Sequence, residues 1–152
     1  MHSLANLARP MQTKKELFVN RKIIVPLAMK PIAERAGYAP AVRVENLVFC
    51  AGQVGRDANM NVINDPEKQF EACWDNLATV LSAAGCSFED IVEMTTYHVG
   101  LQQHMHTFRK VKDRIFPRGT CAWTCIGVAE LAHPNLLVEI KVVAAISSPP
   151  HE

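Results

Sequence analysis

The sequence predicts an α+β domain in which two helices cover one face of a mixed β-sheet. Two long segments carry apolar residues at steps of three and four, which is typical of helices with one buried face. The other apolar segments are short, rich in β-branched residues and bounded by Gly, Pro or Asn, as strands are. Along the chain these patterns follow the order strand, strand, helix, strand, helix, strand, strand. This order is typical of an α+β fold.

The first strands are predicted in the N-terminal third of the chain. The β-branched run RKIIVPLA at 21–28 contains Pro26, and proline is tolerated in a strand at the edge of a sheet. The segment AVRVENLVFCAGQVG at 41–55 has apolar residues on both sides of Glu45 and Asn46. It therefore predicts either a hairpin or one long bent strand.

The first helix is predicted between Asp65 and Gly85. Asp65 suits the N-cap, Pro66 the first helical position, and Gly85 the residue just past the end. Its apolar stripe consists of Phe70, Cys73, Trp74, Leu77, Val80, Leu81 and Ala84. A strand at 91–100 follows, and then a second helix that Pro117 ends. The apolar residues of this second helix are Met105, Phe108, Val111, Ile115 and Phe116.

The segment at 121–146 predicts two strands joined by a turn. One face of the second strand carries Leu136, Val138, Ile140, Val142, Ala144 and Ile146. The other face is also mostly apolar and carries Leu137, Glu139, Lys141, Val143 and Ala145. Because the two predicted helices cover only one face, we expect a second subunit to cover the other. Glu139 would then lie near a subunit boundary, where either an ion pair with an Arg or Lys or a functional role would account for a carboxylate.

Length, charge and hydropathy narrow the class of protein. The chain has 152 residues, 49% of them hydrophobic and 20% charged, which suits one domain at 21–147 with tails at 1–20 and 148–152. The net charge is +1 with both signs mixed along the chain, so nucleic acid is not a favoured partner. No apolar run is long enough to span a membrane, and the first residues lack the pattern of a secretory signal. Five cysteines without framework spacing suit a reducing compartment, so we expect a cytoplasmic protein.

No metal or cofactor site is predicted. Cys121 and Cys125 on one strand would lie roughly 13 Å apart, too far to share a zinc ion. His104 and His106 are two residues apart in a helical segment, so they do not share a face. The segment GQVGR at 52–56 lacks the G-x-G turn of a dinucleotide-binding loop.

Four segments together resemble the RidA family, also called YjgF/YER057c/UK114. They are NLVFCAGQVG, CWDNLATVLSAAGCSFEDIV, VEMTTYHV and LLVEIKVVAAI, and the resemblance spans roughly residues 35–147. It implies a chorismate-mutase-like fold and a homotrimer with clefts between its subunits. It also implies hydrolysis of reactive enamines and imines, such as 2-aminoacrylate, to keto acids and ammonia.

The resemblance extends to some of the family's functional residues and not to others. Tyr38 matches a Tyr before the first long strand, Glu139 matches the Glu that orients water, and Cys125 matches a Cys two residues after the substrate-binding Arg. Ala51 stands where the family has the Ser of an S-G-Q motif. Trp123 stands where the family has the Arg that binds the substrate carboxylate. Two polar groups of the family's site are therefore absent.

The Trp at position 123 changes what the site can bind. A guanidinium binds a carboxylate through two parallel hydrogen bonds, whereas an indole offers one N–H and no charge. Arg118 and Arg35 are the candidates to supply the missing cation. Trp123 would either stack on a larger, planar ligand or fill the cavity. Cys125 is expected to line the core or the pocket, because no His has an evident place beside it to activate a nucleophile.

Two functions remain open on this reading. The protein is either a divergent enamine or imine hydrolase or a non-catalytic trimer that binds a small metabolite in its subunit clefts. In the hydrolase, Glu139 would hold or deprotonate water, Tyr38 would donate a hydrogen bond in the cleft, and the substrate would be a conjugated or ring-bearing enamine. The RNA cleavage for which some family members are named is not favoured by the charge balance.

Overall fold

The computed structural model describes residues 19–116 and 118–147, and within them the strands form one mixed sheet. The strand order is β1-β2-β3-β7-β5-β6, and β4 pairs with β7 beside this path. Only β5 and β6 are paired in parallel; the other pairs of these described strands are antiparallel. The strands are β1 Arg21–Ile24, β2 Ala41–Val44, β3 Leu47–Cys50, β4 Gln53–Val54, β5 Ile91–His98, β6 Ala122–Gly127 and β7 Val138–Ala145. The predicted α+β class with a mixed sheet is confirmed.

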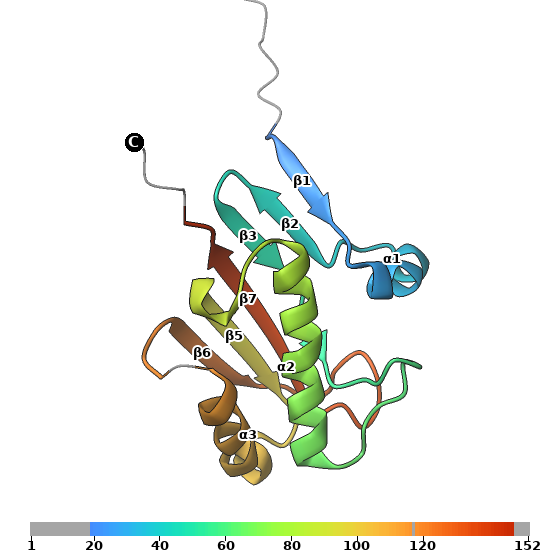
Figure 1. The fold of residues 1–152 in the computed structure, drawn as a ribbon. Coiled ribbons are helices and arrows are strands. Elements are labelled where there is room, and N and C mark those ends of the chain that lie inside the picture. The colour runs from blue at the N-terminus through green and yellow to red at the C-terminus, as the bar shows by residue number, and fades with distance from the viewer. Residues whose placement is uncertain (1–18, 117, 148–152) are drawn as a thin grey trace, which may run out of the picture.

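Two helices, α2 (Pro66–Ala83) and α3 (Leu101–Ile115), lie on the same side of this sheet (Figure 1). The predicted signals of α2 are confirmed: the Asp65 carboxylate accepts a hydrogen bond from the backbone N–H of Lys68 at 2.9 Å, and Gly85 has a φ of 77°. The apolar stripe packs against the sheet and against α3, and its members Phe70, Cys73, Trp74, Leu77, Val80 and Leu81 are fully buried. The prediction that Pro117 ends α3 falls outside the described residues.

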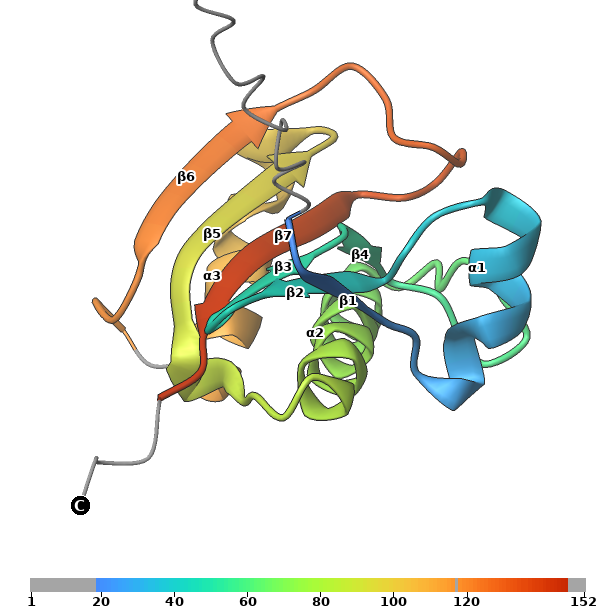
Figure 2. The same cartoon turned by 90° about the horizontal axis from the view of Figure 1, so that it is seen from above.

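The N-terminal part contains the predicted edge strand and one helix that was not predicted. β1 ends at Ile24, and the chain continues through a 3-10 turn at Leu27–Met29 into α1, Lys30–Ala36. Figure 2 shows α1 apart from α2 and α3, to the side of the sheet. The segment at 41–55 forms the hairpin rather than the long bent strand, since β2 and β3 pair through a turn at Glu45.

The prediction that the last two strands form a hairpin is wrong. β5 lies between β6 and β7, so that it pairs with β6 in parallel and with β7 antiparallel. The ten residues at 128–137 connect β6 to β7 across the end of β5 and are too long for a tight turn. The two faces of β7 are nevertheless as predicted, because Val138, Ile140, Val142 and Ala144 are buried while the residues between them are not.

The register places Glu139 and Trp123 on opposite faces of the sheet. Glu139 pairs with Tyr97, which in turn pairs with Ile126, so these three share the face that α2 and α3 leave open. Trp123 pairs with Met94, which is buried under the helices. The open face also carries exposed apolar side chains, with Phe49 45% and Ile126 39% exposed.

Candidate functional site

Glu139 lines a pocket of about 490 Å³ at the end of the sheet where β4 pairs with β7. The walls come from α1, from β4 and the loop after it, from α2 and from the segment that leads into β7. Most of the wall is apolar and is made by Ala28, Met29, Ile32, Ala36, Val54, Ala58, Met60, Ala132 and Leu136. The polar side chains that line it are Tyr38, Gln53, Arg56, Asp57, Asn76, Thr79 and Glu139. Such a pocket, apolar with a few polar groups, is typical of a small-molecule site.

The Glu139 carboxylate is half-buried and has no ion pair within the described residues. Burial raises its pKa above the ordinary range of a carboxyl group. The carboxylate lies directly against Gly52, where a Cβ atom would overlap with it. Gly52 therefore provides the space that Glu139 occupies, and residues 19–116 and 118–147 supply no ion pair that would explain this carboxylate.

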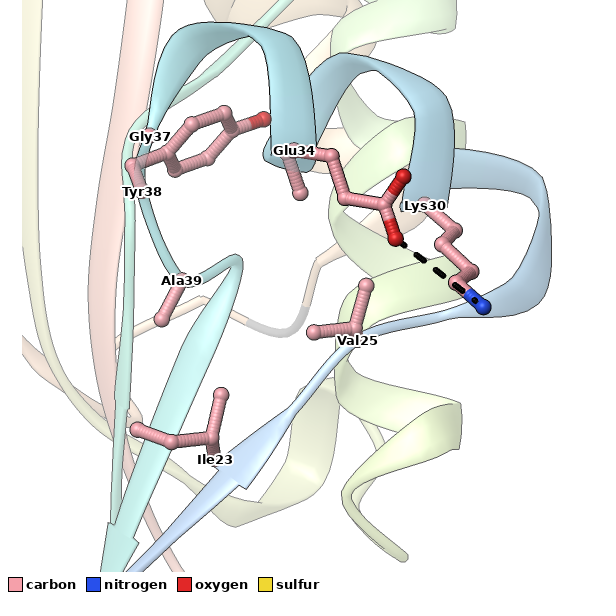
Figure 3. A pocket seen from close by; sticks show the side chains of 8 residues that line it. Ile23, Val25, Lys30, Glu34, Gly37, Tyr38 and Ala39 are labelled. Carbon is pink, nitrogen blue, oxygen red and sulfur yellow. Dashed lines mark ion pairs between the residues drawn. The ribbon is translucent and has the colours of Figure 1, made fainter.

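Tyr38 lies in the same pocket as Glu139, which brings two of the predicted site residues together. It follows Gly37, whose φ of 70° turns the chain at the end of α1. Tyr38 also lines a neighbouring hollow between α1 and β1, where Figure 3 shows it across from Ile23 and Val25. Its side chain is thus placed between two concave surfaces and is accessible from both.

Arg56 is a residue of this pocket that the sequence reading missed. It lies just after β4 and forms an isolated bridge with Val62. Its backbone is held by Asn76 of α2, whose side-chain amide donates to the carbonyls of Val54 at 2.8 Å and of Arg56 at 3.2 Å. The Nε atom of Arg56 is buried and has no hydrogen-bond partner. No signal in the sequence marked this role, because Arg56 is a single charged residue in a loop.

Trp123 is not part of the Glu139 pocket within one chain. Its indole N–H donates to the Thr96 hydroxyl at 2.9 Å, and its ring centroid lies 6.1 Å from that of Phe108 in α3. Two cations of α3 lie by the ring, with Lys112 Nζ at 5.1 Å from the centroid and the Arg109 guanidinium carbon at 6.0 Å. The ring is therefore already engaged by its own chain.

The other predicted site residues lie outside the Glu139 pocket as well. Cys125 is exposed on β6, two residues after Trp123. Ala51 is half-buried, and its backbone N–H donates to the Pro40 carbonyl at 2.9 Å. Arg118 is 80% exposed, lies 3.8 Å from the Asp113 carboxylate and borders a hollow of about 270 Å³ beside Trp123. Arg35 is exposed in the last turn of α1 and is not among the residues that line the pocket.

The described residues contain neither a metal-binding cluster nor a membrane-spanning helix. Among them, no three His, Cys, Asp or Glu side chains come close enough together to hold a metal ion. No helix in this part of the chain has the length and apolar character needed to cross a membrane.

Comparison with known proteins agrees with the resemblance read from the sequence. The profile of the family described as Endoribonuclease L-PSP matches residues 28–146. The chain belongs to this family, the RidA/YjgF family. The YjgH protein of Escherichia coli K12, a RutC family protein, is 33% identical over 129 residues, which is 84% of this chain and 97% of that protein. A solved structure named Protein YJGH has a TM-score of 0.79 and 32% identity, and covers 86% of this chain and all of the other.

Some relatives of this RidA-family chain carry the name of a reaction. A protein of Dermatophagoides farinae named 2-iminobutanoate/2-iminopropanoate deaminase is 29% identical over 131 residues, 83% of this chain and 96% of that protein. A 3-aminoacrylate deaminase RutC of Acinetobacter baylyi is 29% identical over 130 residues, 83% of this chain and 98% of that protein.

Proposed function

We propose that this RidA-family protein is an enamine or imine deaminase that uses Glu139 to activate water. The observation that carries the proposal is the half-buried, unpaired carboxylate, with its raised pKa, in a pocket large enough for a small organic substrate. An ionisable group kept partly out of water has a cost, and a functional use explains why it is retained. The deaminase names of two relatives support the reaction class.

The reaction needs a base that accepts a proton from water and a hydrogen-bond donor that positions the nitrogen or the water. Protonation of the enamine carbon converts the enamine to a protonated imine. Water then attacks the carbon of this imine while Glu139 accepts a proton from the water. Glu139 returns this proton to the nitrogen, and the tetrahedral intermediate collapses to a carbonyl, with release of ammonia and of the hydroxyl proton. A raised pKa makes Glu139 a stronger base than an exposed carboxylate. Tyr38, in the same pocket, is placed to donate a hydrogen bond to the nitrogen or to the water.

The substrate is proposed to be larger and less polar than 2-aminoacrylate. The pocket is wide and mostly apolar, and it suits a conjugated or ring-bearing enamine. With Trp123 and Ala51 in place of an Arg and a Ser, we expect weak or absent hydrolysis of 2-aminoacrylate. The Dermatophagoides relative is named for 2-iminopropanoate, which is the imine tautomer of 2-aminoacrylate. Turnover of 2-aminoacrylate equal to that of this relative would contradict the expectation. Trp123→Arg alone should raise it only modestly, because the ring's packing would be lost and Ala51 would remain.

A homotrimer with the ligand in clefts between subunits is part of the proposal. The open face of the sheet has exposed apolar side chains, among them Leu47, Phe49 and Ile126, and a second copy would cover them. Trp123 and Cys125 project from the other face of the edge strand, so they would reach a Glu139 only across a subunit boundary. Light scattering at micromolar concentration should give three times the chain mass. A monomer mass would rule out this assembly.

The test of the function is Glu139→Gln, which keeps the shape and removes the base. Ammonia release from enamines generated in the assay should fall by at least 100-fold, while the mass in solution stays that of the wild type. Full activity in the variant would show that the assignment is wrong. Dissociation of the assembly would indicate that Glu139 is a structural group instead.

The alternative is a non-catalytic protein that binds a metabolite. The replacement of the family's Arg by Trp123 is the observation that favours it. A thermal-shift screen separates the two, because a ligand raises the melting temperature by mass action. A ligand that binds without ever being converted, and that binds equally to Glu139→Gln, would support the binding function.

A further inference from the structure

We propose that Arg56 binds the carboxylate of the substrate in the Glu139 pocket and that the apolar wall of this pocket favours substrates with an apolar or aromatic side chain. This inference rests on the proposed function and assigns the residue that anchors the substrate in the same pocket. It places the anchoring cation on the loop after β4 and not on β6, where Trp123 stands.

The first support is that the Arg56 side chain has no ion-pair partner among the residues that the structure describes. Its Nε atom is buried and has no hydrogen bond to any of these residues. The adjacent acid is committed elsewhere, since the Asp57 carboxylate accepts hydrogen bonds at 2.9 Å from the backbone N–H groups of Asn59 and Asn61. A partly buried guanidinium without an anion is unfavourable, and an incoming carboxylate would relieve this.

The second support is the position of Arg56 relative to Glu139. Both side chains line one pocket, yet they are farther apart than the 4.0 Å of an ion pair. This leaves room for a ligand to lie between them, with its carboxylate at Arg56 and its imine carbon near Glu139. The hydrogen bonds from Asn76 fix the backbone at Arg56, so the point from which this side chain enters the pocket is set before the ligand arrives.

The third support is that the cations near Trp123 lie outside the Glu139 pocket and that two of them, Lys112 and Arg118, lie beside an acid. Lys112 pairs with Asp113 at 2.8 Å, and Arg118 lies 3.8 Å from the same carboxylate. Both border the hollow beside Trp123 rather than the Glu139 pocket. The remainder of the Glu139 pocket is an apolar wall that includes Met29, Ile32 and Leu136. A carboxylate with an apolar body therefore matches both parts of the pocket.

The probe is phenylpyruvate, an aromatic 2-keto acid of the product class, with benzyl methyl ketone as the matching ketone without a carboxylate. Calorimetric titration should show that Arg56→Gln weakens phenylpyruvate binding at least tenfold, with a smaller loss for Arg56→Lys, which keeps the charge without the planar fork. Binding of the neutral ketone should be the same in wild type and Arg56→Gln. Arg21→Gln, on the exposed edge strand β1, is the control for lost charge and should bind as the wild type does.

The outcomes separate this inference from the proposed function. Unchanged phenylpyruvate affinity in Arg56→Gln, or a loss in Arg118→Gln instead, would overturn the inference even if Glu139→Gln had abolished ammonia release. Conversely, Arg56-dependent binding of phenylpyruvate by a protein that releases no ammonia would uphold the inference and end the deaminase proposal. If Arg56→Gln does not fold, the phenylpyruvate affinity of Arg56→Lys is compared with that of the wild type. A weaker affinity in Arg56→Lys would support the inference, and equal affinities would overturn the bidentate contact at Arg56.

Discussion

Glu139 and Trp123 lie in the same sheet but on opposite faces of it, and their surroundings differ. The Glu139 pocket contains a carboxylate without an ion pair and an Arg side chain with an unpartnered Nε. At Trp123 the polar groups are engaged, since the indole N–H bonds to Thr96 and Lys112 pairs with Asp113. A polar group whose bonds are made within the chain stabilises the fold, whereas one left unpaired in a pocket is available to a ligand. The polar groups of the Glu139 pocket are therefore available to a ligand, whereas those around Trp123 stabilise the fold.

The largest effect on the Glu139 pocket is expected from a substitution at Gly52, and Gly55 offers a comparison outside the reacting groups. A methyl group at Gly52 would overlap with the end of the Glu139 side chain, which can rotate away. Gly52→Ala should therefore leave the fold intact and reduce turnover by about 100-fold, because the base is displaced. A methyl group at Gly55 would overlap with the backbone carbonyl of Gln69 in α2, which cannot move alone.

Gly55→Ala is the matched control for that variant. We expect it to lower the free energy of unfolding by about 3 kcal/mol, measured by urea denaturation, whereas Gly52→Ala should change this free energy little. Full turnover in Gly52→Ala would show that the position of the Glu139 carboxylate is not important for the reaction.

Trp123→Phe tests whether the contacts of Trp123 stabilise the fold. Trp123→Phe keeps an aromatic ring but removes the N–H that bonds to the buried Thr96, so we expect a loss of about 1 kcal/mol, or about 2–4 °C in melting temperature. Thr96→Val and the double variant complete a cycle whose coupling energy should be about 1 kcal/mol. No coupling would mean that the Trp123 indole is not held by this bond and is free to contact a ligand.

Local signals predicted the parts of the fold that depend on neighbouring residues in the chain. Asp65, Pro66 and Gly85 mark the ends of α2 because caps and turns are made within a few residues. The alternation along β7 predicted a half-buried Glu139 for the same reason. α1 was missed because it is short and carries no apolar stripe; Ala33 is its one buried residue.

Long-range features could not be read from local signals. The pairing of β5 between β6 and β7 depends on contacts between distant segments, and periodicity carries no information on strand order. Arg56 is a single charged residue in a loop, and what makes it a site residue is its proximity to Asn76 and Glu139 in space. Resemblance to the family drew attention to position 123, whereas the cation that lines the Glu139 pocket is at position 56.

The smallest expected effect is a pH-dependent stabilisation by Glu139→Gln. Burial raises the pKa of Glu139 in the folded protein above its value in the unfolded chain. Below both pKa values the carboxyl is neutral in both states, so wild type and variant should melt at similar temperatures. As the pH rises through the folded pKa, burial of the charged form costs the wild type stability that the neutral amide of the variant does not lose.

Differential scanning fluorimetry of the two proteins from pH 4 to pH 8 measures this difference. The melting temperature of Glu139→Gln should rise above that of the wild type with increasing pH, by less than the change at Trp123→Phe. The Trp123 variant is the control, since its deficit should be the same at every pH. If Glu139→Gln instead became the less stable protein at high pH, the carboxylate would have a cationic partner in the assembled protein. Glu139 would then resemble the satisfied groups around Trp123, and the contrast between the two regions would fail.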